Sequence, residues 1–192
     1  QRISTLPSDR RMTVIGSSLL NQVVIENRVH SPSDIIYQLD ERLVHMLKQE
    51  KLRFGNVQDG MDLAVIHVDV KNKVLKFSSA KRPMLFIRDG KLNEYKGSKH
   101  SVGGIRSGEK TFEEFRIGLM EEDQCFLYSD GFTDQFGGEK GKKYSSRRLK
   151  EKILSLHLMP VQLQHKEIAR EFDTWKGDHE QVDDVCLIGI RF

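Results

Sequence analysis

The sequence has little cysteine and no long apolar run, and each of these features limits the class of protein to which the chain can belong. Its two cysteines, Cys125 and Cys186, lie in apolar runs and form no CxxC pair, so they are interpreted as reduced core residues. No segment approaches the roughly 18 apolar residues that cross a bilayer, and the N-terminus lacks a signal-peptide pattern. We therefore expect a cytoplasmic domain that makes no membrane contact.

A strong charge of either sign is also missing. The 31 Lys and Arg residues against 28 Asp and Glu residues leave a net charge of +3, which is too small to indicate a nucleic-acid partner. The densest basic cluster is short and is interpreted as a solvated loop leading into a helix, with a specific anion site as the alternative. It consists of Lys140, Lys142, Lys143, Arg147 and Arg148. With 38% hydrophobic and 31% charged residues, the chain is expected to form one globular domain over residues 1–192.

Several common catalytic motifs are absent as well. The serines lack a GxSxG nucleophile elbow, and the seven histidines show no HExxH spacing. The sequence contains neither a Walker loop nor a dinucleotide-binding fingerprint. Serine-nucleophile, zinc-peptidase and nucleotide-binding functions are therefore disfavoured.

What the sequence does contain is a clear order of predicted elements. Helical spacing of apolar residues predicts helices at residues 14–25, 31–47, 145–156 and 161–175. Period-two alternation predicts strands at residues 63–70, 74–80, 84–88, 92–95, 112–119, 124–128 and 185–192. Short links at residues 71–73 and 89–90 are typical of hairpins, which makes the sheets largely antiparallel. Helices, a strand meander, helices and one returning strand predict an α+β fold.

Acidic residues stand where two of these apolar runs meet a turn. Asp130 follows the run that ends at Tyr128, and Asp183 and Asp184 open the last run of the chain. Gly131 is expected to permit a sharp turn that leaves the Asp130 carboxylate exposed. Adjacent carboxylates repel one another unless a cation offsets them, and Mg²⁺ and Mn²⁺ prefer oxygen ligands. If the two strand ends are neighbours in one sheet, Asp130 and Asp183 can share a metal, whereas Asp-Gly alone is also an ordinary turn.

These motifs together resemble the SpoIIE-like branch of the metal-dependent protein phosphatases, the bacterial relatives of protein phosphatase type 2C. The resemblance extends from about Val14 to Phe192 and includes Tyr128-Ser129-Asp130-Gly131 and the closing Asp183-Asp184. The segments that carry it are residues 15–21, 59–62, 80–87, 128–138, 175–177 and 180–184. It implies an αββα sandwich, in which two antiparallel sheets are flanked by helix pairs.

The resemblance also implies a chemistry and a set of partners. Members of this branch hydrolyse phosphoserine or phosphothreonine with water activated by two Mn²⁺ or Mg²⁺ ions. By resemblance, Asp130 and Asp183 are metal ligands, and Asp184 and Gly131 are further candidates at the site. The implied substrate is a phosphorylated signalling protein of the anti-sigma-factor-antagonist type. An upstream sensor domain is implied in the parent protein, with the first two helices transmitting its state.

One part of the family pattern is not found in this sequence. The family supplies further metal ligands from an early Gly-Asp strand and from an Asp-x-x-Gly-His-Gly motif before the first helix. Residues 1–11 contain neither motif and resemble an upstream linker or junction. The sequence thus carries at most half of a two-metal site, and an inactive regulatory or partner-binding relative is the alternative. A homodimer through the apolar stripes of the first two helices is a further hypothesis, although such stripes are more often core.

Overall fold

The computed structural model describes residues 8–54, 60–103 and 109–192, and these residues form two compact units. The first unit comprises Gln1–Arg82 and Lys96–Gly118, and the second comprises Pro83–Tyr95 and Leu119–Phe192. Residues 1–7 of the expected linker and Asp59 of one quoted motif lie outside the described residues. No helix in the described part of the chain combines the length and apolarity needed to cross a membrane.

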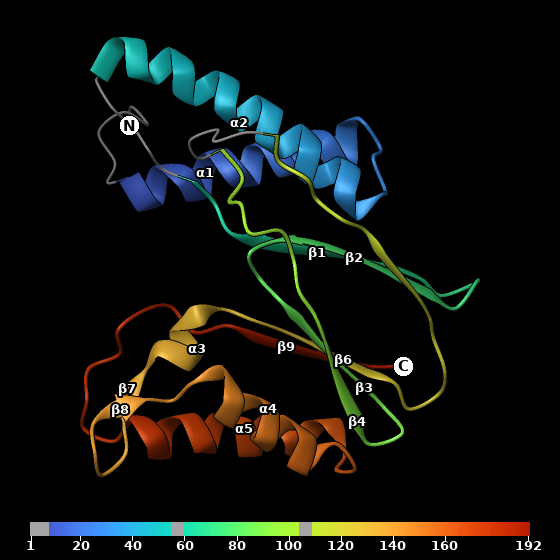
Figure 1. Ribbon diagram of the computed structural model, residues 1–192, viewed down its shortest axis with the longest axis vertical. Helices are drawn as coiled ribbons and strands as arrows, with labels where there is room; N and C mark the ends of the chain where they lie inside the picture. Colours follow the sequence, from blue (N-terminus) through green and yellow to red (C-terminus); the bar gives the residue numbers. More distant parts are fainter. Residues whose placement is uncertain (1–7, 55–59, 104–108) are drawn as a thin grey trace. The chain divides into compact units, whose positions relative to one another are not determined.

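The first unit is a helix pair on a three-stranded sheet (Figure 1). Its helical elements are α1 (Ser8–Asn21), the π-helix η2 (Gln22–Glu26) and α2 (Pro32–Phe54). Its antiparallel strands are β1 (Leu63–Asp69), β2 (Val74–Ala80) and β5 (Phe115–Gly118), in the order β1-β2-β5. The apolar stripe of α2, including Ile35, Leu39 and Leu43, is buried in the core of this unit together with Val23. The stripe of α2 is therefore core, which is the more common of the two interpretations, whereas Leu20 and Ile25 of the first helical segment are exposed.

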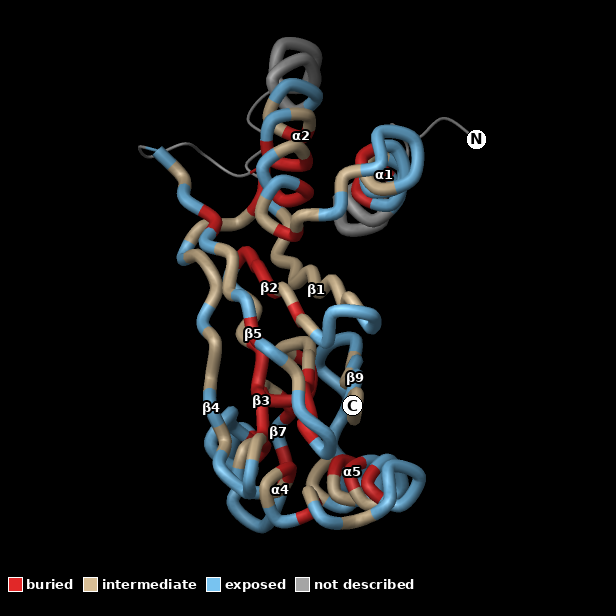
Figure 2. The backbone as a smooth tube through the Cα atoms, turned by 90° about the vertical axis from the view of Figure 1, so that its right-hand side faces the viewer, coloured by how far each residue is buried: buried red, intermediate tan, exposed pale blue. Residues whose placement is uncertain are grey.

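The second unit is a four-stranded antiparallel sheet with a helix pair on one face. The strands are β3 (Met84–Arg88), β4 (Lys91–Tyr95), β6 (Gln124–Tyr128) and β9 (Leu187–Arg191), in the order β4-β3-β6-β9. Figure 2 shows β3 as a buried strand, and only Arg88 at its end is partly exposed. The covering helices are α4 (Ser146–Leu156) and α5 (Val161–Lys176).

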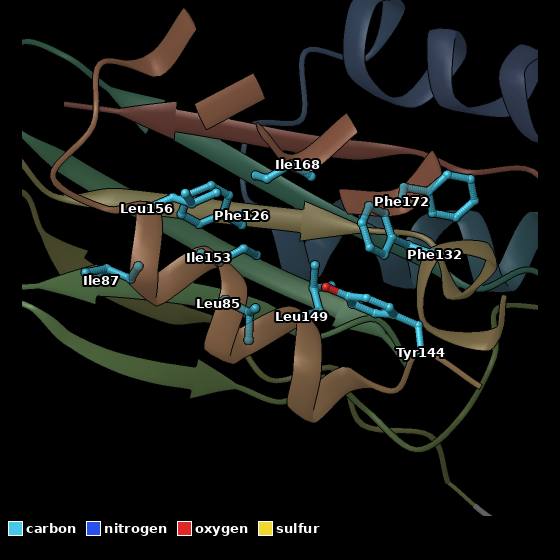
Figure 3. Close-up of a cluster of buried hydrophobic side chains, with 10 residues drawn as sticks. All are labelled: Leu85, Ile87, Phe126, Phe132, Tyr144, Leu149, Ile153, Leu156, Ile168 and Phe172. Atoms are coloured by element: carbon cyan, nitrogen blue, oxygen red, sulfur yellow. The ribbon is translucent and has the colours of Figure 1, made fainter. Parts of the chain in front are cut away.

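The core of the second unit joins its helices to its sheet. Figure 3 shows Leu149 and Ile153 of α4 and Ile168 of α5 gathered against strand residues such as Phe126. Phe132 and Tyr144 extend this core toward the end of β6, where their rings make an edge contact with centroids 5.3 Å apart. Aromatic edge contacts of this kind add to the stabilisation that burial gives. The segment after β6 is thus fixed to the helix layer.

The predicted α+β class, with antiparallel sheets and helix pairs, is confirmed. Three strands, β2, β3 and β6, have the predicted bounds, and α2 begins at Pro32 as its capping sequence predicts. Ser31 caps this helix through a long hydrogen bond, in which its Oγ accepts the Asp34 N–H over 3.4 Å, and the same hydroxyl donates to Glu114 over 2.8 Å. The single-domain prediction stays a prediction.

Other boundaries differ from the sequence-based expectation. The first helix begins at Ser8 and continues into η2, and β5 is four residues long where residues 112–119 were predicted as strand. Phe112 is buried beside α2 instead, where its N–H donates to the Tyr37 hydroxyl over 3.0 Å. Helix α3 (Asp130–Asp134) and the hairpin of β7 (Phe136–Gly137) and β8 (Lys142–Lys143) were not predicted.

The two cysteines differ, which corrects the expectation that both belong to the core. Cys125 is buried in β6, whereas Cys186 is exposed. Val185 and Leu187 on either side of Cys186 are partly buried against the core of the second unit. Because side chains alternate between the two faces of an extended segment, Cys186 points away from that core.

Candidate functional site

The two acidic motifs come to the same end of the second unit's sheet. β6 and β9 are antiparallel neighbours, and Tyr128 at the end of β6 pairs with Leu187 at the start of β9. Asp130 follows β6 and Asp183 precedes β9, so both lie beyond this end of the strand pair. The condition for a shared site, that the two strand ends be neighbours, is met.

Ser129 joins the two motifs directly. Its N–H donates to the Cys186 carbonyl over 2.9 Å, and its hydroxyl donates to the Asp184 carbonyl over 2.9 Å. The same hydroxyl accepts the Cys186 N–H over 2.9 Å. A single serine side chain therefore continues the strand pairing and holds the Asp184 peptide beside the start of α3.

The Asp183–Asp184 peptide packs against Gly131. A Cβ added to Gly131 would lie 2.4 Å from the carbonyl oxygen of Asp184 and 3.2 Å from the carbonyl carbon of Asp183. These are backbone atoms, so no side-chain rotation can make room. Gly131 does not have a positive φ and lies in the first turn of α3. The glycine is required by close approach of the backbone, and not by the sharp turn that its sequence context suggested.

The carboxylates around this contact differ in exposure. Asp130, the first residue of α3, is partly buried, while Asp183 and Asp184 are exposed. Asp183 accepts the N–H of Asp184 at its Oδ1 over 2.7 Å, which fixes the orientation of that carboxylate relative to its own backbone. The Thr133 hydroxyl donates to the carbonyl of Asp130 over 3.2 Å and closes the first turn of α3.

The buried side chain of Gln135 binds the main chain of the segment that precedes Asp183. Its side-chain amide donates to the Glu180 carbonyl over 2.9 Å, and its Oε1 accepts the Val182 N–H over 3.3 Å. Its side chain is fully buried, at 0% exposed surface. Unpaired polar groups are costly in such a place, so these bonds hold residues 180–182 strongly to the end of α3. The position of Asp183 follows from these bonds.

The main chain of Gln135 and the glycines after it bind the end of α5. The Trp175 indole N–H donates to the Gln135 carbonyl over 3.1 Å, and the Gly138 N–H donates to the Trp175 carbonyl over 2.8 Å. A Cβ on Gly137 would lie 1.8 Å from the Trp175 carbonyl oxygen, so only glycine fits there. The end of α5 and the segment leading to Asp183 are therefore fixed to β7.

The carboxylates at this end of the sheet match only part of what a hard divalent cation requires. Carboxylates from two separate segments match the oxygen ligands that Mn²⁺ and Mg²⁺ prefer. Among residues 8–54, 60–103 and 109–192, however, no group of three or more His, Cys, Asp and Glu side chains is placed to hold a metal ion. Asp130 and Asp183 thus lie at the same end of the sheet, with Asp184 and the Gly131 backbone beside them.

Sequence reasoning missed the residues that hold these acids in place. Ser129 and Gln135 both lie inside the quoted segment 128–138, but neither was assigned a role. Their partners are 45 to 57 positions away in the sequence, so no local pattern reveals them. The one local signal was their position, since both residues lie within the segment that carries the Asp-Gly motif.

The comparisons with known proteins identify the family and the fold. The sequence profile of the family described as Stage II sporulation protein E (SpoIIE) matches residues 12–192. The SiaA-PP2C domain of Pseudomonas aeruginosa is similar in structure with a TM-score of 0.81 and 25% identity, covering 94% of this chain and 69% of that chain. No protein of curated function matches the chain by sequence.

Two further solved structures share the fold at lower identity. The Mn-presoaked phosphatase domain of the cell fate determinant SpoIIE from Bacillus subtilis has a TM-score of 0.54 and 15% identity, covering 97% of this chain and 75% of that chain. The RsbU and RsbW domains of a Mycobacterium tuberculosis protein give a TM-score of 0.66 and 16% identity, covering 94% of this chain and 46% of that chain. The fold is therefore that of PP2C-type phosphatase domains.

Proposed function

The chain belongs to the SpoIIE family of PP2C-type phosphatase domains, and we propose that it is a metal-dependent protein phosphatase acting on phosphoserine or phosphothreonine. The observation that carries the proposal is the contact of Gly131 with the Asp183–Asp184 peptide, which gathers acidic residues at one end of the sheet. Carboxylates gathered at a rigid sheet end are chemically suited to a divalent cation. The similarity to a Mn-presoaked phosphatase domain supports the same class.

In this proposal Asp130 and Asp183 are the metal ligands, and Asp184 and the Gly131 backbone are secondary candidates. A bound Mn²⁺ or Mg²⁺ ion would supply Lewis acidity toward water and the phosphoryl oxygens. The chain's own residues contribute by holding the acidic segment in position. Ser129 holds the Asp184 peptide against the start of α3, and Gln135 fixes the segment before Asp183. The main chain on both sides of Asp183 is thus held by the chain's own contacts.

The proposed substrate is a phosphorylated bacterial signalling protein of the anti-sigma-factor-antagonist type, dephosphorylated in the cytoplasm. The solved structure that joins RsbU and RsbW domains in one protein supports a role within partner-switching regulation. An upstream sensor domain would act through α1 and α2, which pack on the sheet of the first unit. Such a sensor would belong to a longer parent protein.

The test is Mn²⁺-dependent phosphate release from a phosphoserine peptide, together with Mn²⁺ binding by calorimetry. Asp130→Asn and Asp183→Asn are each expected to reduce both turnover and Mn²⁺ binding to background. Asp178→Asn is the matched control, because Asp178 is an exposed acid on the same loop and lies outside the proposed ligand set. Turnover that survives both substitutions would contradict the assignment of these ligands.

A second candidate is an inactive phosphatase-like domain that regulates or binds a partner. It is favoured by the lack of a set of three metal-ligating side chains among the described residues. It is also favoured by the absence of both early ligand motifs from residues 1–11. A folded protein that binds phosphopeptide but neither binds Mn²⁺ nor releases phosphate would establish this alternative.

A further inference from the structure

An exposed basic surface lies directly beside the acidic site. Between positions 136 and 148 the sequence holds five cationic residues and one acidic residue, Glu139. This local excess is larger than the net charge of +3 carried by the whole chain. All five cationic side chains are exposed, and we name them together the basic hairpin surface: Lys140, Lys142, Lys143, Arg147 and Arg148.

The members of this surface differ in how far their charge is already offset. Lys143 lies 3.0 Å from Asp134, and Arg147 lies 2.9 Å from Glu151, but all four of these side chains are about half exposed or more. Exposed pairs of this kind are worth little because solvent screens them. Lys140 and Lys142 have no ion pair within the described part of the chain, so their positive charge remains available to a partner.

The remaining member is held by an aromatic ring. The Arg148 guanidinium carbon stands 4.3 Å from the centroid of the Trp175 ring, a cation–π contact. This contact fixes the position of Arg148 without neutralising its charge. Trp175 is the same residue that the Gln135 carbonyl and Gly138 hold, so part of the basic hairpin surface is rigidly connected to the acidic site.

The basic hairpin surface and the acidic segment lie side by side. Helix α3, which starts with Asp130, leads into β7, and the Ser145 N–H donates back to the Thr133 carbonyl over 2.8 Å. On the other side, a Cβ on Gly141 would lie 3.9 Å from the His179 ring, in the loop that continues to Asp183. Figure 1 shows the β7–β8 hairpin next to this loop. The lysines therefore lie within reach of residues that flank a group bound at the acidic site.

We propose that the basic hairpin surface docks acidic residues that flank the phosphorylated residue of a protein substrate. This inference rests on the proposed phosphatase function and adds the chemistry of the substrate's flanks. The adjacent Asp130, Asp183 and Asp184 repel a continuous polyanion such as a nucleic acid. A peptide carries negative charge only at intervals, so it can place its acids on Lys140 and Lys142 while its phosphorylated residue enters the site. Complementary charge of this kind steers association and selects partners.

The experiment uses the full chain without added Mn²⁺ and measures binding by fluorescence anisotropy. The probes are a labelled phosphoserine peptide flanked by aspartates and a matched peptide flanked by asparagines. The aspartate-flanked peptide should bind more tightly, and its affinity should fall as salt is raised. Lys140→Glu combined with Lys142→Glu should weaken its binding roughly tenfold or more, since two attractive contacts become repulsive. The asparagine-flanked peptide should be affected much less.

The matched control is Lys91→Glu combined with Lys166→Glu, which makes the same change in net charge. Lys91 pairs with Arg88 at the opposite end of the sheet, and Lys166 is an exposed residue of α5. Equal weakening in the control, or equal binding of the two peptides, would overturn the proposal. Tighter binding of single-stranded DNA than of the aspartate-flanked peptide would also overturn it. Because binding is measured without metal, it does not depend on turnover: hairpin-dependent binding together with no phosphate release in the separate Mn²⁺ assay would mean that the phosphatase proposal fails while this one stands.

Discussion

Gly131 and Asp184 are 53 positions apart, yet a Cβ on the glycine would lie 2.4 Å from the carbonyl oxygen of the aspartate. This separation is shorter than any ordinary carbon–oxygen contact, so the two backbones touch with no side chain between them. The acidic segment before β9 is therefore positioned by the backbone of α3. The glycine of this Asp-Gly pair is therefore explained by packing and not by a turn.

Gly131→Ala is expected to displace the Asp183–Asp184 peptide. The added methyl group meets main-chain atoms that cannot rotate away, so the substitution should cost about 1–3 kcal/mol of unfolding free energy, as overpacking does. Urea unfolding measures this cost, and calorimetry measures the accompanying loss of Mn²⁺ affinity. Gly118→Ala is the matched control, because nothing lies within 4 Å of its added Cβ. Equal stability of the two variants would contradict the packing argument.

Gln135→Leu should release the segment before Asp183. The substitution keeps the side-chain volume but leaves the Glu180 carbonyl and the Val182 N–H without their partner. Each unsatisfied buried group costs about 1–3 kcal/mol, and exposure of the loop to water offsets part of that cost. Trp175, the only tryptophan in the sequence, bonds to the main chain of Gln135, so its fluorescence should shift to the red as the loop opens.

The control for this variant is Gln162→Leu on the exposed side of α5. It makes the same chemical change without removing a buried hydrogen bond, and it should leave both the emission of Trp175 and the urea midpoint unchanged. An unchanged emission spectrum in Gln135→Leu would show that the segment before Asp183 is held by other contacts.

The parts of this fold that the sequence predicted carry their signal locally. Strands β3 and β6 are continuous apolar runs bounded by polar residues, and Pro32 fixes the start of α2 within a single turn. Asp130 and Asp183 were selected as candidate ligands because each places an acid next to the end of an apolar run. Their meeting at one end of the sheet required only that β6 and β9 be neighbours, which the register of Tyr128 with Leu187 confirms.

The parts that the sequence did not predict depend on contacts far away along the chain. Helix α3 is five residues long and starts with Asp-Gly, which is indistinguishable from a turn without its tertiary contacts. Phe112 has strand-like neighbours, but the Tyr37 hydroxyl and ring draw it toward α2. Gln135 is an ordinary polar residue until its partners at Glu180 and Val182 are known. Cys186 differs from Cys125 because of the sheet face that it occupies, and not because of its local composition.

Arg88→Met tests the ion pair that closes the other end of the second unit's sheet. Asp123 has a side chain only 1% exposed, and it accepts hydrogen bonds from the Arg88 guanidinium and from the Met120 N–H. The Asp123 carboxylate in turn raises the pKa of Arg88, so this cation stays charged. Removal of the cation leaves a buried carboxylate uncompensated. The cost should be about 2–4 kcal/mol, somewhat below that of a fully buried pair because Arg88 is 28% exposed.

Two comparisons sharpen this test by urea unfolding. Arg147→Met removes an exposed pair with Glu151 and should change the stability by less than about 0.5 kcal/mol. Arg88→Met combined with Asp123→Leu removes the stranded carboxylate and should recover part of the loss. The double variant could instead be less stable than Arg88→Met by as much as Asp123→Leu alone destabilises the protein. That result would indicate that Asp123 stabilises the fold mainly through Met120 and not through Arg88.

Cys125 should make the protein less stable in alkali. Burial raises the pKa of its thiol from 9.0 to about 12, because the folded core disfavours the thiolate. Between these values the unfolded chain releases the thiol proton while the folded chain keeps it, so the unfolded state binds fewer protons. The stabilisation is complete below pH 9 and is lost as the pH rises toward 12, at a slope of about 1.4 kcal/mol per pH unit for this group.

Cys125→Ala should remove this group's contribution to the pH dependence of the unfolding free energy, measured by urea unfolding across this range. Cys186→Ala, which alters an exposed thiol, should leave the slope unchanged, and a flattened slope in both variants or in neither would contradict the assignment to Cys125.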